Sequence, residues 1–304
     1  MTAELTFKKT MEFEYGVPAE LAPGVARIVA NNPSPFTFKG TNTYLVGTDE
    51  LALIDPGPDD DAHIEAILRA ARGRRISHVI ITHTHRDHTD GMPKVLAATG
   101  AVTCGYGRSV MTPGDVRMSP SGSEFVDQSF APDIVMRSGD KVSGPGWALE
   151  AVFTPGHAPD HLCLALEGQR LLFSGDHVMA WNTTVVAPPE GSMADYMASL
   201  SVLLARAAND DVYLPGHGGR IDNPARVVKA FIVHRTWREQ AVLGAIRDGT
   251  NNIRDIVSRV YQGLDERLVK AACLSVQAHV EHLISRGLVQ CDGPPTFDRP
   301  LSAV

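Results

Sequence analysis

The chain has 304 residues, a length that suits one large domain or two smaller ones. Its hydrophobic content of 43% and charged content of 21% are ordinary for a globular protein, and no stretch approaches the roughly 18 apolar residues that a membrane span needs. Residues 1–224 carry 17 basic and 27 acidic residues, which argues against strong non-specific binding to nucleic acid by the whole chain. The four cysteines are far apart and form no C-x-x-C pair, so we expect reduced thiols and a cytoplasmic location. Because no apolar stretch is long enough to span a membrane, we expect no membrane partner.

The first part of the chain alternates short apolar runs with turn signals. Runs that predict strands cover residues 42–46, 51–54, 76–82, 147–154, 162–166, 171–174 and 211–214. Helical spacing covers residues 62–71, a short segment after Pro93, and residues 195–208. Strands outnumber helices, and hairpins mix with crossovers. This pattern predicts an α+β fold in which two sheets carry outer helices.

The character of the sequence changes near residue 223. Helical patterns then cover residues 225–247, 253–261 and 266–286, and a closing hairpin is expected at 288–291 and 296–297. Helices followed by a small hairpin are typical of a winged-helix module. We therefore predict a catalytic domain at 1–223 and a helical winged-helix-like domain at 224–304. The long helix could build a homodimer interface or one wall of a cleft, and we do not expect DNA to be a partner.

Residues 83–88 read His-Thr-His-Arg-Asp-His and directly follow an apolar strand. Three later turns also carry ligand-type residues after a predicted strand, namely 154–157 with His157, 174–177 with Asp176, and 214–218 with His217. Imidazole nitrogen and carboxylate oxygen suit Zn²⁺ or a similar divalent transition metal. The sequence therefore predicts a metal centre built from several strand ends.

These motifs, in this order, resemble those of the metallo-β-lactamase-fold hydrolases. The resemblance implies a four-layer αβ/βα sandwich with a two-metal site at one edge of the sheets. It implies that two Zn²⁺ ions, or other divalent transition metals, are bound by His83, His85 and His157 at the first position and by Asp87, His88 and His217 at the second, with Asp176 bridging both. Residues 40–44, 55–57, 195–200 and 234–240 are similar to the β-lactamase-like protein 2 subfamily, which adds a C-terminal winged-helix-like domain. Asp90 departs from the glycine usual there, and we expect it to adjust a helix start. The alternative is that it changes the contacts around the metal ligands.

The expected reaction is hydrolysis by a metal-bridging hydroxide. Asp87 is predicted to accept a proton as well as to bind metal. His161 is predicted as a catalytic residue, with a structural histidine as the alternative. The subfamily resemblance implies an endoribonuclease acting on single-stranded RNA. A small-molecule ester, thioester or lactone hydrolase similar to glyoxalase II is the alternative, and a non-enzymatic, metal-dependent binding or regulatory protein is the third.

Four other residues near these motifs are given supporting or structural roles. The resemblance implies that Asp55 supports the metal site through hydrogen bonds to its ligands. His177 and His78 are expected to be structural, with His78 in the core. His63 is expected to face solvent.

Overall fold

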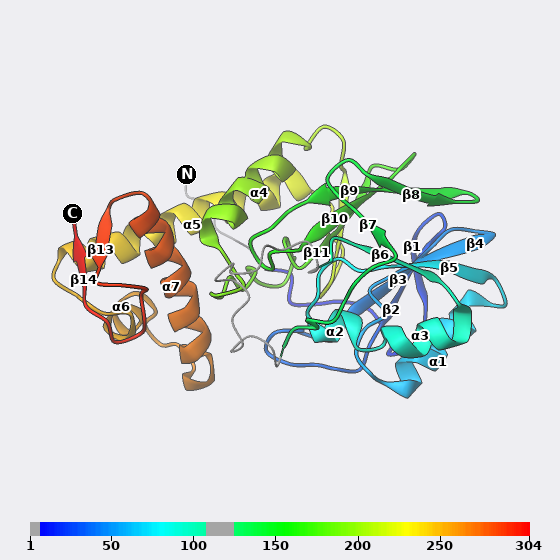
Figure 1. Cartoon of the computed structure of the whole chain (residues 1–304), viewed down its shortest axis with the longest axis horizontal. Coiled ribbons are helices and arrows are strands. Elements are labelled where there is room, and N and C mark those ends of the chain that lie inside the picture. The colour runs from blue at the N-terminus through cyan, green and yellow to red at the C-terminus, as the bar shows by residue number, and fades with distance from the viewer. Residues whose placement is uncertain (1–6, 108–124) are drawn as a thin grey trace.

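The computed structural model describes residues 7–107 and 125–304. Two β-sheets dominate the larger part of the molecule (Figure 1). The first is a seven-stranded sheet in chain order, made of β1 (Ala19–Ala22), β2 (Val25–Val29), β3 (Asn42–Val46), β4 (Glu50–Ile54), β5 (Arg75–Ile80), β6 (Val102–Gly105) and β7 (Ile134–Val135). The strands from β4 to β7 run parallel to one another, so their carboxyl ends lie at one edge.

The second sheet has five strands in the order β12-β11-β10-β9-β8. Its strands are β8 (Lys141–Gly144), β9 (Trp147–Phe153), β10 (Leu162–Leu166), β11 (Leu171–Gly175) and β12 (Val212–Pro215). Strands β8 to β11 pair antiparallel, and β12 pairs parallel to β11. The carboxyl ends of β11 and β12 therefore meet at the same edge.

The two sheets and their helices form four layers. The apolar faces of the sheets pack against each other, with Tyr44 and Ile54 on one side and Leu149 and Phe173 on the other. Helices α1 (Asp61–Ala71) and α3 (Met92–Thr99) cover the outer face of the first sheet. Helices α4 (Met193–Ala205) and α5 (Pro224–Arg247) cover the outer face of the second (Figure 1). The αβ/βα sandwich expected from the sequence is thus confirmed.

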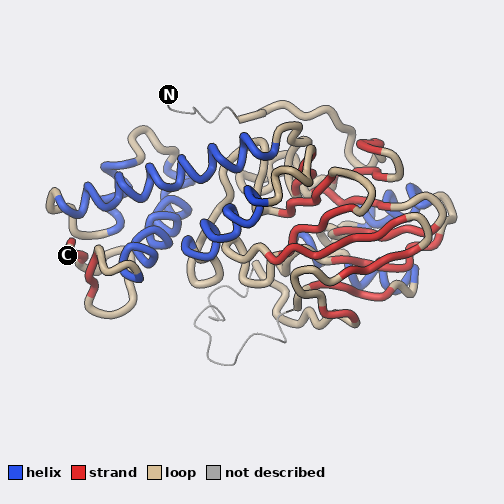
Figure 2. Tube along the Cα trace, turned by 90° about the horizontal axis from the view of Figure 1, so that it is seen from above, coloured by secondary structure: helices blue, strands red, loops and turns tan. Residues whose placement is uncertain are grey.

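The C-terminal part has a separate apolar core. It is built from the second half of α5, α6 (Ile253–Val260), α7 (Val269–Ser285) and a two-stranded sheet of β13 (Val289–Cys291) and β14 (Leu301–Ala303). The first half of α5 packs on α4, so this one helix belongs to both cores (Figure 2). Asn223, whose side chain accepts from the Arg226 N–H, caps the start of α5. Within the described ranges, no helix is long and apolar enough to cross a membrane.

Three details differ from the sequence-based expectations. The second strand of the closing hairpin lies at Leu301–Ala303 and not at 296–297, because the Phe297 carbonyl accepts from the Ile253 N–H at the start of α6. His63 is buried, with 2% of its surface exposed, rather than solvent-facing. Gly57 makes room for this ring, since a Cβ at that position would lie 2.9 Å from the His63 ring. His78 is half-buried and packs edge-on against Trp147.

Candidate metal centre

The ligand-type residues meet where the strands end. The run 83–88 begins just after β5 and includes the short helix α2 (Arg86–Thr89). Asp176 directly follows β11, and His217 lies two residues beyond β12. Because Gly175 pairs with Pro215 across these parallel strands, the turns that carry Asp176 and His217 lie side by side. His157 comes from the loop that follows β9.

Three imidazoles form the first group of donor atoms. His83 Nε2 lies 2.9 Å from His85 Nδ1, and His85 Nδ1 lies 3.0 Å from His157 Nε2. His83 is fully buried, whereas His85 and His157 are partly exposed. Three convergent nitrogens at one point suit a transition-metal ion.

A second group combines a carboxylate with two imidazoles. Asp87 Oδ2 lies 3.4 Å from His88 Nε2 and 3.3 Å from His217 Nε2. Asp176 lies between the two groups, because its Oδ2 is 3.6 Å from His157 Nε2 and 3.2 Å from His217 Nε2. All seven residues predicted as ligands therefore come together in space; their role as ligands stays a prediction.

Two buried atoms of this cluster that could bind a metal have no hydrogen-bond partner among the residues that the structure describes. They are Nε2 of His88 and Oδ1 of Asp176, which lie 3.8 Å apart. A buried polar atom without a partner is costly. A bound cation would satisfy both atoms, so the residues present fit a metal centre.

Asp55 orients rings in both groups. Its Oδ2 accepts from His88 Nδ1 at 2.9 Å and from the Thr82 hydroxyl at 2.7 Å, and its Oδ1 accepts from the Thr82 N–H at 2.8 Å. Because the Thr82 hydroxyl donates to Asp55, it accepts from His83 Nδ1 at 3.0 Å. These bonds leave the Nε2 lone pairs of His83 and His88 facing the centre, as predicted for a supporting carboxylate.

Backbone carbonyls fix two further rings. His157 Nδ1 donates to the Val185 carbonyl at 2.7 Å, and His217 Nδ1 donates to the Gly40 carbonyl at 3.3 Å. The Thr41 hydroxyl donates to Asp87 Oδ2 at 3.0 Å. Sequence reasoning missed these contacts with Thr41 and Val185, because a carbonyl or a threonine hydroxyl carries no distinctive sequence signal.

The two groups differ in their electrostatics. Burial and the neighbouring His157 ring lower the pKa of His85 to about 3. Burial also lowers the pKa of His83 and that of His157, so all three imidazoles of the first group favour the neutral form. Burial also lowers the pKa of His217, but Asp176 and Asp87 outweigh it and raise the pKa to about 9. Burial raises the pKa of Asp87, but His88 and His217 outweigh this effect and hold it below its usual value. The carboxylates of Asp87 and Asp176 thus attract positive charge.

Gly216 allows the backbone to approach the centre closely. A Cβ there would lie 2.4 Å from Asp176 Oδ1 and 2.8 Å from His88 Cε1. The turn is also tied to the first sheet, because the Asn42 side chain donates to the carbonyls of Pro215 and Gly218 at 2.8 and 2.9 Å. The ligand-bearing edges of the two sheets are therefore bonded to each other.

His161 lies beside the cluster but offers it no free nitrogen. Its Nε2 accepts from the Asp176 N–H at 3.1 Å, so its Nδ1 carries the proton and donates to the Thr154 hydroxyl at 2.9 Å. This arrangement suits a residue that positions Asp176 better than one that transfers protons. The predicted catalytic role of His161 finds no support in these contacts.

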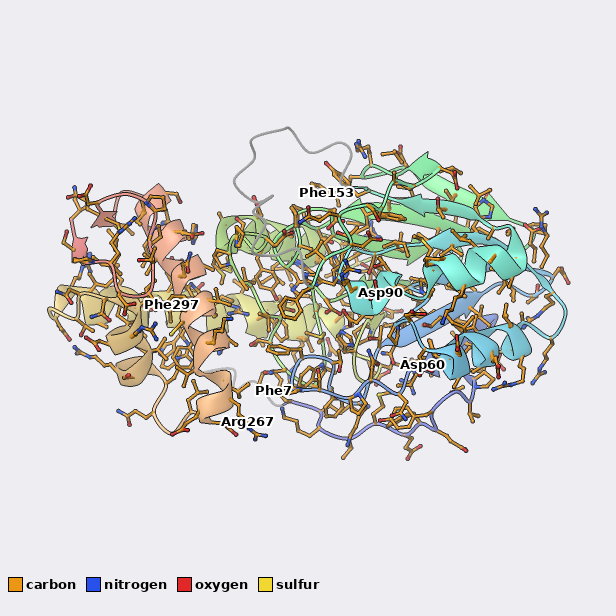
Figure 3. All side chains as sticks on the ribbon, turned by 60° about the horizontal axis from the view of Figure 1, so that its bottom comes forward. Phe7, Asp60, Asp90, Phe153, Arg267 and Phe297 are labelled. Atoms are coloured by element: carbon orange, nitrogen blue, oxygen red, sulfur yellow. The ribbon has the colours of Figure 1, made fainter. Side chains whose placement is uncertain are left out.

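His177 and Asp90 lie close to the cluster, and the structure shows the surroundings of both. His177 is fully buried, and its ring lies 4.5 Å from that of Tyr196, as expected for a structural residue. Asp90 follows α2 (Figure 3). Its carboxylate pairs with Arg86 at 3.1 Å. It therefore ends one short helix rather than starting the next, because α3 begins after Gly91.

Comparisons with known proteins agree with this architecture. A family model described as "Metallo-beta-lactamase superfamily" matches residues 36–217, and one described as "Beta-lactamase associated winged helix domain" matches residues 253–294. The crystal structure of a metallo-beta-lactamase family protein from Thermus thermophilus superposes with a TM-score of 0.75 at 22% identity, covering 94% of this chain and all of that one.

Two named relatives are similar in sequence. A "Beta-lactamase-like protein 2 homolog" from Caenorhabditis elegans is 31% identical and covers 91% of this chain and 90% of its own length. An "Atrochrysone carboxyl ACP thioesterase" from Aspergillus fumigatus is 33% identical over 75% of this chain and 66% of its own length. The matched family model, the fold and the His/Asp cluster agree, and the chain belongs to the metallo-β-lactamase superfamily of hydrolases, with an associated C-terminal winged-helix domain.

Proposed function

We propose that the chain is a two-metal hydrolase that cleaves a carboxylic ester or thioester, carried by a small molecule or by an acyl carrier. The observation that carries this proposal is the convergence of two donor groups with Asp176 between them. One ion would be held by His83, His85 and His157, the other by Asp87, His88 and His217, with Asp176 shared. Nitrogen and carboxylate donors of this kind favour zinc.

Metal ions held there would supply Lewis acidity to a carbonyl oxygen and lower the pKa of a coordinated water toward roughly 7. The protein orients the ligand rings through Asp55 and the Val185 carbonyl. Substrate would approach from the side of His85 and Asp87, because these residues are partly exposed whereas His88 is fully buried. The lowered pKa of Asp87 makes it a weak base, so we assign it to metal binding.

Two observations support a substrate whose reacting group is an uncharged carbonyl and not the phosphate of a polyanion. Residues 1–224 have an excess of acidic groups, which repels polyanions. One relative at 33% identity carries the printed name of a thioesterase. Cleavage of single-stranded RNA is the second candidate.

The observation that favours RNA is the presence of two exposed phenylalanines on segments bonded to the centre. Phe125 is 69% exposed, and its carbonyl accepts from the N–H of Arg86, which follows His85. Phe36 is 53% exposed on the loop that leads to Thr41, which bonds Asp87. Exposed aromatic rings of this kind can stack on unpaired bases.

Turnover by the zinc-loaded protein separates these candidates. Acyl thioesters of several chain lengths would be followed by release of free thiol, and labelled single-stranded RNA would be followed by strand cleavage. We expect thiol release that requires metal and no RNA cleavage. Metal-dependent RNA cleavage without thiol release would replace our first candidate by the second, and inactivity of the metal-loaded protein on both panels would contradict both.

A further inference from the structure

Arg235 is a buried cation on the helix that the two cores share. It lies in α5, is 4% exposed, and its guanidinium lies 5.4 Å from the ring centre of Tyr196 on α4. Among the residues that the structure describes, no carboxylate forms an ion pair with it. Burying a guanidinium without a counter-ion is unfavourable, so Arg235 depends on its hydrogen bonds to be stable in this position.

Those hydrogen bonds connect the C-terminal part to the loop behind the metal centre. One Nη donates to the carbonyl of Thr184, in the loop between β11 and α4. The other donates to the Ser275 hydroxyl of α7 at 3.4 Å. Arg235 therefore holds Thr184 in a fixed position relative to helices α5 and α7.

Thr184 is in turn bonded to the segment that carries Asp176. Its hydroxyl donates to the Asp176 carbonyl at 2.7 Å and lies 2.9 Å from the His177 carbonyl. The next residue, Val185, offers the carbonyl that orients His157. Thr184 and Val185 thus support two of the proposed ligands from adjacent positions.

The geometry points to Arg235 as a positioning residue, through which the C-terminal helix α5 sets the placement of Asp176 and His157. Arg235 touches neither ligand directly and acts through Thr184. This inference rests on the proposed metal centre, and it gives α5, the helix that both cores share, a role in the site that is separate from any contact with substrate.

Arg238 offers a matched control on the same helix. It lies about one turn further along α5, and its Nη1 also donates to a backbone carbonyl, that of Val260, at 3.2 Å. Its guanidinium lies 4.0 Å from the Tyr261 ring centre. Both contacts stay within the C-terminal part, so Arg238→Met removes a comparable interaction without touching the loop at Thr184.

The test measures zinc affinity by competition with a chromophoric chelator and the visible spectrum of the Co²⁺-loaded protein. Arg235→Met is expected to weaken zinc binding by about 10-fold or more and to shift the cobalt bands, since contacts to ligand-supporting residues have effects of this size. Arg238→Met is expected to leave both unchanged. Wild-type affinity and spectrum in a folded Arg235→Met protein, or equal losses in both variants, would overturn the inference.

Thr184→Val tests the second link, in case Arg235→Met does not fold. Loss of the hydroxyl should weaken zinc binding, Thr184→Ser should restore it, and unchanged binding in Thr184→Val would also overturn the inference. In the metal-free protein, amide exchange at residues 176–185 should rise in Arg235→Met and not in Arg238→Met. If wild-type protein binds no zinc, the proposed centre itself fails; if it binds zinc and the variants behave like wild type, only the role of Arg235 fails.

Discussion

Asp55 Oδ2 accepts a hydrogen bond from His88 Nδ1 at 2.9 Å, although the two residues are 33 positions apart in the chain. Asp55 directly follows β4, and the parallel pairing of β4 with β5 brings it beside Thr82 and the ligand-bearing run. Its backbone has a φ of +52°, which aspartate tolerates better than most residues. The carboxylate is thus held where it fixes the His88 ring.

Asp55→Asn should lower zinc affinity by about 10- to 100-fold, because an amide cannot accept all the hydrogen bonds that this carboxylate receives. Chelator competition measures the change. Asp59→Asn is the matched control, since that exposed carboxylate pairs with Lys94 at the surface. Equal affinity in the Asp55 variant and wild type would show that the His88 ring does not depend on this bond.

Gly216→Ala should displace Asp176 and His88, because the added methyl would lie 2.4 Å from Asp176 Oδ1. We expect weaker metal binding and a loss of turnover of about 10-fold or more. Gly219→Ala serves as the control, since its nearest neighbours would be 4.0 Å from the new Cβ. Zinc content and thiol release of the two purified variants provide the comparison, and identical values would contradict the prediction.

His161→Gln should retain most activity, whereas His161→Leu should lose about 10-fold or more. The glutamine oxygen can replace Nε2 as acceptor for the Asp176 N–H, whereas leucine cannot. Steady-state turnover across pH is the measurement, and the pH profile of the glutamine variant should match wild type. Equal inactivation by both substitutions would instead support proton transfer by His161.

The buried His63 ring should make the metal-free protein less stable in mild acid. Burial lowers its pKa from 6.5 to about 4, so below pH 6.5 the unfolded chain takes up a proton that the folded chain does not. The free energy of unfolding should therefore fall as the pH drops from 6.5 toward 4, with a total of about 3 kcal/mol from this group. Urea unfolding with chelator at pH 7 and pH 5 measures the fall, which should be smaller in His63→Gln.

The sequence allows the candidate metal ligands to be predicted because their chemistry is rare and their position is regular. Each of His83, Asp176 and His217 follows closely after an apolar strand, and strand ends meet at sheet edges. The long helix predicted at 225–247 is present as Pro224–Arg247, since its helical period is a local feature of the sequence. Asp55 was recognised only through family resemblance, because a lone carboxylate before Pro-Gly also suits a simple turn.

Other features depended on contacts that the local sequence does not encode. Strand β1, with the sequence Ala-Glu-Leu-Ala, is too short to show a clear strand period, and it is a strand because it pairs with β2. The His63 ring can be buried because Gly57 has no side chain at the point where the ring packs against it. The bonds from Arg235 to Thr184 and onward to Asp176 join residues up to 59 positions apart, and no spacing rule predicts such a connection.

The donor atoms are divided between the two sheets, with His83 to His88 following a strand of one, and His157, Asp176 and His217 following strands of the other. Neither half alone assembles a complete coordination shell. During refolding, tight zinc binding should therefore begin when the two sheets pack against each other, after the hairpins within each sheet have formed. Zinc binding would then report that the native topology is complete.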